Sequence, residues 1–209
     1  MNRLYGILTV CLLSLVAVSG CADPTRDKPQ AEVAEAVPVP EKPSEARRFV
    51  LGEDSSFGFV GSKVTGSHDG GFRTFEGEIL VVDSDPTRSR ISVSIDATSL
   101  WADNDRLTGH LKSADFFDVE TYPAAGFEST EIVRDGDHFR MTGNLTLHGV
   151  TKSVSFPAHI VLEDDRVTAS AEFSIFRFDF DIVYKGKADD LIRDAVLIRL
   201  NLVGVAEET

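Results

Sequence analysis

Few residues of this chain are arranged to perform chemistry. The five histidines, the side chains best suited to bind a metal near neutral pH, show no close metal-ligand spacing. They are His68, His110, His138, His148 and His159. The sequence has no nucleophile elbow, no phosphate-binding glycine loop and no dinucleotide-binding fingerprint. Its many carboxylates gather in turns, where they are normally solvated, so a two-carboxylate hydrolase is an alternative without a specific signal. We expect no catalytic residue, no metal and no required cofactor.

Both cysteines lie near the start of the chain, at Cys11 and Cys21. None follows, which excludes a disulfide framework, a zinc cluster or a thiol nucleophile in the folded part. An apolar run at residues 4–18 is too short to span a bilayer comfortably and predicts a secretory signal. It leads into residues 18–21, Val-Ser-Gly-Cys, which resemble the lipobox of bacterial lipoproteins.

This resemblance implies that residues 1–20 are a signal peptide and that Cys21 becomes the acylated first residue. Several acyl chains on one residue give stable membrane anchoring. The next residue is Ala22 rather than Asp, which favours the outer membrane over the inner membrane. We therefore expect a lipoprotein of the cell envelope that faces the periplasm. An ordinary signal peptide that happens to contain a cysteine is the alternative.

Residues 21–48 differ in composition from the rest of the chain. They contain no aromatic residue and no sustained apolar period, and they hold five of the eight prolines. This composition predicts a disordered tether that keeps the following domain away from the membrane. The net charge of −13 argues against a nucleic-acid partner, because phosphate binding requires clustered Lys and Arg.

Residues 49–206 alternate between apolar and polar side chains, as strands with one buried face do. In one such segment Ile91, Val93 and Ile95 alternate with polar residues. The others are 55–64, 75–81, 127–133, 139–147, 153–160, 167–175 and 195–205. Short Asp- and Gly-rich turns separate many of them and favour hairpins. This pattern predicts one all-β domain, an eight-stranded antiparallel barrel that is filled by its own side chains or holds one small ligand.

Residues 99–118 break the strand pattern. Leu107 and Leu111 are spaced by one helical turn, and Asp103 or Asn104 can cap the start of a helix. We predict a short helix at 104–113, followed by a helical turn at 114–118. Such a helix could close one mouth of the barrel.

Three motifs resemble the YceI-like family. They are LTGHLKSADFFDVETYPAAGFES at residues 107–129, GNLTLHGVTKSV at 143–154 and, more weakly, FSIFRFDF at 173–180. The resemblance covers the whole domain and implies an extracytoplasmic, lipocalin-like barrel that binds a polyisoprenoid chain, such as a quinone or a prenyl phosphate. It also implies that His110 and His148 make structural hydrogen bonds, and that a homodimer is possible. Segments 61–72 and 179–184, near the expected mouth, depart from the family pattern.

A bound isoprenoid would need a continuous apolar tunnel with few polar anchors. The candidate ligand contacts are inward-facing residues, aromatic residues near the lid and two arginines for the head group. They are Ile91, Val93, Ile95, Trp101, Phe116, Phe117, Phe139, Met141, Leu145, Phe156, Ile160, Phe173, Ile175, Arg106 and Arg177. For either arginine a solvated surface position or a structural ion pair is the alternative, and Arg177 with Asp179 is a candidate pair.

Two interpretations of the interior stay open at this stage. Small residues on the inward face, such as Gly77 and Gly143, either leave room for a guest or admit large side chains opposite them. A hollow barrel would bind lipid, whereas a filled one would serve as an interaction module that docks on an envelope partner.

Overall fold

The computed structural model describes residues 23–207. The signal peptide and the acylated Cys21 that the sequence predicts lie outside the described residues. Within residues 23–207, no helix is both long and apolar enough to cross a membrane.

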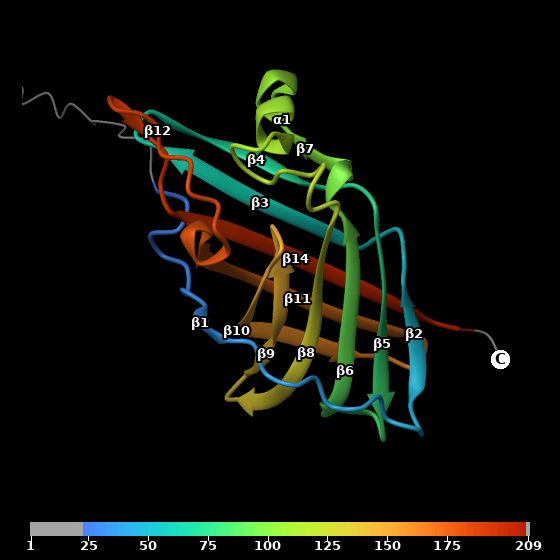
Figure 1. The fold of residues 1–209 in the computed structure, drawn as a ribbon. Coiled ribbons are helices and arrows are strands. Elements are labelled where there is room, and N and C mark those ends of the chain that lie inside the picture. Colours follow the sequence, from blue (N-terminus) through green and yellow to red (C-terminus); the bar gives the residue numbers. More distant parts are fainter. Residues whose placement is uncertain (1–22, 208–209) are drawn as a thin grey trace, which may run out of the picture.

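Eight antiparallel strands close into a barrel, which confirms the predicted fold class (Figure 1). In order around the barrel they are β2 (Arg47–Leu51), β5 (Phe75–Val82), β6 (Asp85–Asp96), β8 (Ala124–Asp135), β9 (His138–Leu147), β10 (Val150–Leu162), β11 (Arg166–Phe176) and β14 (Ala195–Ala206). Ladder pairing between β11 and β14 completes the ring.

The two ends of the barrel differ. At one end, here called the turn end, tight turns at 83–84, 136–137 and 163–165 join the strands. The other end, the helix end, carries α1 (Asp105–Lys112) and the short η1 (Ala97–Ser99) and β7 (Leu100–Ala102) (Figure 1). The helix begins after Asn104, whose side chain accepts a hydrogen bond from the backbone N–H of Leu107.

Strand β14 holds two sets of strands together. Its residues Gly204–Ala206 pair with β2, while Leu197–Asn201 pair with β3 (Ser56–Lys63). β3 continues the sheet to β4 (Gly66–Phe72), and β4 pairs with β7. After β11 the chain forms η2 (Arg177–Phe180) and a small hairpin, β12 (Gly186–Lys187) and β13 (Asp190–Leu191). These segments surround the helix end of the barrel.

Hairpin turns keep the strands in register. His148 and Gly149 join β9 to β10 with positive φ angles of 51° and 73°. Two consecutive residues with positive φ are the geometry whose twist matches that of the flanking strands. Gly149 suits this position because a Cβ there would lie 2.4 Å from the ring of Tyr122. The sequence motif at 143–154 is therefore a hairpin whose turn is fixed by close packing.

The turn end of the barrel is filled with side chains. Phe49, Ile79, Ile91, Phe139 and Val167 are each at most 4% exposed and belong to the main apolar core. An inward glycine admits large neighbours there, since a Cβ on Gly204 would lie 2.9 Å from the Cβ of Phe49. Packing of this kind makes half of the barrel solid.

Residues 23–46, here called the strap, do not form the disordered tether that the sequence predicts. The strap includes β1 (Glu32–Glu35), pairs with β10 and then crosses the outside of the barrel to reach β2 (Figure 1). Ala31 packs into the core, and the backbone of Val37 exchanges two hydrogen bonds with the Asn144 amide. The prolines at 38, 40 and 43 lie in the exposed stretch beyond β1, so they do not interrupt its pairing.

Replacing Gly143 by Ala should destabilise the barrel, because the new methyl group has no room beside Phe127. We expect a loss of about 1–3 kcal/mol in the free energy of unfolding, measured by urea denaturation. Gly109→Ala is the matched control: nothing lies within 4 Å of that position on α1, and Ala favours helix by about 1 kcal/mol. Equal stability of the two variants would show that Gly143 is not a packing requirement.

Candidate functional site

A cavity of about 130 Å³ lies inside the helix-end half of the barrel. Apart from Gly58 and Arg177, its lining consists of apolar side chains. The lining residues are Phe57, Gly58, Phe72, Val93, Ile95, Phe117, Ala125, Phe127, Met141, Leu145, Leu147, Val154, Phe156, Phe173, Ile175, Arg177, Ile182, Val196, Ile198, Leu200 and Leu202. A site of this kind excludes water and favours an apolar guest.

The structure brings many of the predicted ligand contacts together around this cavity. They are Val93, Ile95, Phe117, Met141, Leu145, Phe156, Phe173, Ile175 and Arg177. Ile91, Phe139 and Ile160 instead pack in the turn-end core, because the alternation along a strand gives the inward face but not the depth at which the barrel is hollow. Whether any of these side chains touches a ligand stays a prediction.

Three further predicted residues also lie outside the main cavity. Phe116 is buried beside α1 and lines a second cavity at the mouth. Trp101 lies along an open outer groove of about 750 Å³, where the guanidinium of Arg73 is 5.4 Å from its ring centre. Arg106 is exposed on α1, which matches the solvated alternative.

Sequence reasoning missed one wall of the cavity. Val196, Ile198, Leu200 and Leu202 alternate along β14 and all line the cavity. Their period-two pattern was readable in the last predicted strand and could have placed them there. Ile182 carries no such signal, because it follows the irregular η2 segment and reaches the interior through tertiary folding.

The mouth cavity, of about 250 Å³, lies between α1 and the barrel. Phe117, Arg177, Ile182 and Val196 line both cavities, so these four side chains separate them. The buried hydroxyl of Ser62 also lines the mouth cavity, and it has no hydrogen-bond partner. Ser62 and Ile182 belong to the two segments that depart from the YceI-like pattern, so the departures fall at this mouth.

Arg177 is a buried cation that faces both cavities and is 5% exposed. Its guanidinium donates to the backbone carbonyls of Arg193, Ile182 and Ile192 and does not form the expected pair with Asp179. Burial lowers the pKa of the Arg177 guanidinium, and the charge of Asp194 opposes this effect. The residue therefore fastens the segment after η2 over the barrel and brings positive charge to the interior.

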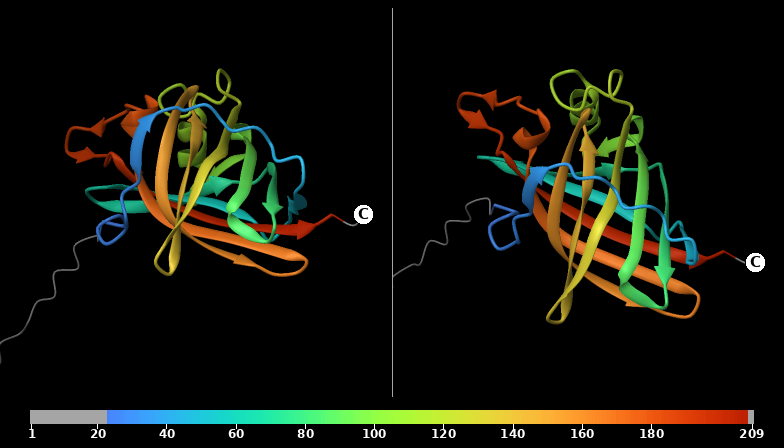
Figure 2. Two further views of the ribbon diagram at one scale, coloured as in Figure 1. Left: turned by 90° about the horizontal axis from the view of Figure 1, so that it is seen from below. Right: turned by 60° about the horizontal axis from the view of Figure 1, so that its bottom comes forward.

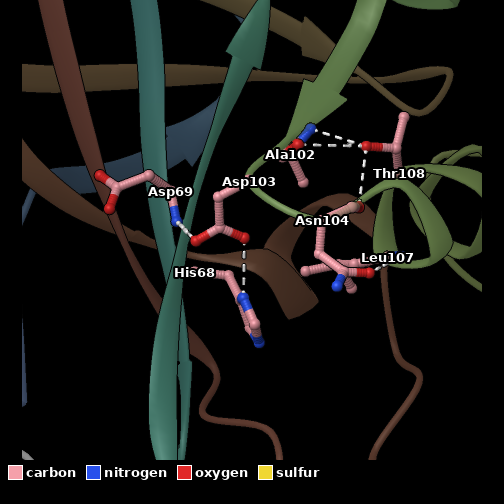
Figure 3. Close-up of polar contacts among 7 residues, drawn as sticks. All are labelled: His68, Asp69, Ala102, Asp103, Asn104, Leu107 and Thr108. Atoms are coloured by element: carbon pink, nitrogen blue, oxygen red, sulfur yellow. Dashed lines mark hydrogen bonds and ion pairs between the residues drawn. The ribbon is translucent and has the colours of Figure 1, made fainter.

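Polar contacts attach α1, here called the lid helix, to the sheet (Figure 3). The carboxylate of Asp103 lies 2.8 Å from Nδ1 of His68 and accepts the backbone N–H of Asp69 at 3.2 Å. The hydroxyl of Thr108 accepts the N–H of Ala102 at 2.9 Å. These bonds hold α1 against β4 and β7, and hence fix Leu107 and Leu111 over the mouth cavity.

The histidines of the two long motifs make structural contacts. Nδ1 of His148 lies 3.1 Å from the carbonyl oxygen of Phe180, and Nε2 of His110 lies 3.0 Å from the Asp115 carboxylate. In the part of the chain that the structure describes, no group of three or more His, Cys, Asp or Glu side chains is placed to hold a metal ion.

Comparison with known proteins assigns the family. The sequence pattern of the YceI-like domain matches residues 50–204. The chain belongs to the YceI-like family. It is 36% identical over 119 residues to Protein YceI of Escherichia coli O157:H7 and to a UPF0312 protein of Pectobacterium atrosepticum. Each match covers 54% of this chain and 62% of the relative, so the chain spans less than two thirds of these curated relatives.

Solved structures share the barrel of this YceI-like domain. BcnA of Burkholderia cenocepacia is similar with a TM-score of 0.62 at 23% identity, over 71% of this chain and 95% of that one. A polyisoprenoid binding domain from Saccharophagus degradans has a TM-score of 0.63 at 18% identity, over 78% and 100%. The Campylobacter jejuni YceI protein has a TM-score of 0.52 at 25% identity, over 67% and 85%.

Replacing Arg177 by Met should loosen the cover of the YceI-like barrel. The change leaves the carbonyl oxygens of Ile182, Ile192 and Arg193 without this donor. We expect a loss of about 1–3 kcal/mol and faster amide hydrogen exchange across residues 181–194. The exposed Arg106→Ala should change stability by less than about 0.5 kcal/mol. Unchanged exchange in Arg177→Met would contradict the fastening role.

Proposed function

We propose that this protein binds an isoprenoid-type lipid, such as a quinone or a prenyl phosphate, and carries or sequesters it at the bacterial cell envelope. The observation that carries the proposal is the apolar cavity at the helix end, which lies inside a barrel of the YceI-like family. The Saccharophagus degradans domain with the same fold, which is termed polyisoprenoid binding, supports this ligand class.

The size of the cavity sets how a lipid would be held. A volume of about 130 Å³ is close to the roughly 150 Å³ cavity that accepts benzene, so it suits a single isoprene unit. A longer chain would displace Phe117 and Ile182 and continue into the mouth cavity, which holds about 250 Å³ more. Each Å² of apolar surface removed from water on binding would contribute about 25 cal/mol.

Two polar groups mark where a head group would lie. The Arg177 guanidinium and the unpartnered Ser62 hydroxyl both face the mouth cavity, and each can donate a hydrogen bond to a quinone or phosphate oxygen. The apolar chain would then point down the barrel toward Met141 and Phe156. In this arrangement the residues bind and orient the lipid, and no step of catalysis is assigned to them.

Cell-envelope placement is part of the proposal. It rests on the apolar run at residues 4–18 and the lipobox-like residues 18–21, which would leave the barrel attached through lipid on Cys21 and facing the periplasm. A homodimer and the choice of the outer membrane remain expectations from the sequence.

Native mass spectrometry tests the proposal. Residues 22–209, produced in a bacterial periplasm and purified without detergent, should carry an extractable lipid whose mass matches a quinone or prenyl phosphate. Ala125→Phe, which places a large side chain in the cavity, should remain folded and lose this mass. The matched control Ser94→Phe changes an exposed position on β6 and should retain it.

A protein that is always free of lipid, and takes up no added isoprenoid, would contradict the proposal. It would favour the interaction module, because a barrel that does not bind lipid could still present its surface to an envelope partner.

A further inference from the structure

The wall of the barrel has a gap that the strap fills. β10 and β11 pair directly only at His159–Leu162 and Val167–Ser170, near the turn end. Toward the helix end the two strands separate, and residues 29–35 lie between them. β1 pairs with residues 152–155 of β10, while Gln30 forms a parallel bridge to Ser174 of β11. Figure 2 shows the blue strap beside the orange β10 and β11 strands.

The strap is part of the inner wall as well as of the hydrogen-bond ladder. Ala31 is 5% exposed and belongs to the main core, and Val33 packs against that core. Val33 is the register partner of Val154, which lines the ligand cavity. The alternation therefore turns Ala31 and Val33 inward and leaves Glu32 and Ala34 exposed.

An aromatic pair lies where the two strands separate. The rings of Phe156 on β10 and Phe173 on β11 stack with centroids 3.9 Å apart and planes 9° apart. Both line the cavity. The gap that the strap fills thus opens directly onto the proposed ligand site, and the stacked rings lie at its inner end.

The strap is held on β10 by a shorter ladder than the one on the other side of that strand. β1 pairs over four residues, whereas β10 pairs with β9 over nine. Its flanking ion pairs, Lys28 with Glu172 and Lys152 with Glu35, lie at the surface, where such pairs add little to stability. Short segments of this kind open locally far more readily than the ladder that they cover.

We propose that residues 29–35 are a removable wall strand, and that their release opens a slot between β10 and β11 through which an apolar chain enters and leaves the barrel. This inference rests on the proposed lipid binding. The cavity is smaller than a polyisoprenoid, and a slot in the wall would let a long chain enter from the side without passing the covered mouth. The strap precedes residues 50–204, so this device lies outside the matched YceI-like domain.

A disulfide that locks the strap tests the inference. Ala34 and Ser153 are register partners of an antiparallel pair, whose Cα atoms lie about 4.5–5.5 Å apart, within disulfide range. The variant Ala34→Cys/Ser153→Cys is made in residues 22–209, which contain no natural cysteine. The control Thr146→Cys/Thr151→Cys locks the other side of β10, where the two hydroxyl oxygens are 2.9 Å apart.

The probe is all-trans-retinol, an isoprenoid alcohol whose fluorescence reports binding. In the strap variant, oxidation should slow retinol uptake by about tenfold or more, and a reducing agent should restore the rate. The control variant should take up retinol at one rate in both redox states. Retinol loaded before oxidation should remain bound in the locked protein and leave slowly.

A second pair of variants tests the opposite change. Ala31→Arg forces a long cation into the core, which should displace the strap and speed both uptake and release. Ala34→Arg alters an exposed position on the same strand and should leave both rates unchanged.

Two results would overturn the inference, and they can be told apart. If retinol binds at equilibrium but neither the strap disulfide nor Ala31→Arg changes its uptake rate, the inference of a slot is wrong and the proposed lipid binding stands. If retinol binds to none of the variants nor to the parent protein, the proposed lipid binding fails and the slot fails with it.

Discussion

The width of an eight-stranded barrel is the constraint on which the rest of this structure depends. Such a barrel can be filled by its own side chains or leave room for one small ligand. Here the outcome changes along the axis: Phe49, Ile79 and Phe139 fill the turn end, whereas the helix end encloses a cavity. Large side chains at one depth thus create a solid base, on which an apolar pocket can remain open without collapse.

The pocket also depends on how its mouth is covered. Arg177 donates three hydrogen bonds to backbone carbonyls instead of pairing with a carboxylate, so it fastens the segment after η2 and keeps two of its five N–H groups for other partners. The lid helix has polar attachments of its own, through Asp103 and Thr108. The two covers also pack on each other, because the rings of His110 and Phe116 lie 5.0 and 5.1 Å from that of Tyr184, so together they cover the mouth.

Much of the fold could be predicted from the sequence because period-two alternation is a local signal. This alternation predicted the barrel strands and the inward faces of β6 and β9, and Asn104 predicted the start of the helix. The position of a residue along the barrel axis is not encoded in this local pattern. The sequence therefore could not place Ile91 in the solid base and Val93 in the pocket. The strap could not be predicted because it pairs with β10 in a gap between β10 and β11, and no local pattern reveals such a gap. Its prolines favour an extended, unpaired chain.

Methyl NMR during titration with an isoprenoid alcohol tests the central claim, that lipid occupies the helix-end half of a barrel whose base is solid. Binding should shift the methyl signals of Leu145, Val154 and Leu202, which line the cavity, and leave those of Ile79, Ile91 and Val167 in the base nearly unchanged. Shifts confined to the base or to the outer surface, with the cavity methyls unmoved, would contradict this account.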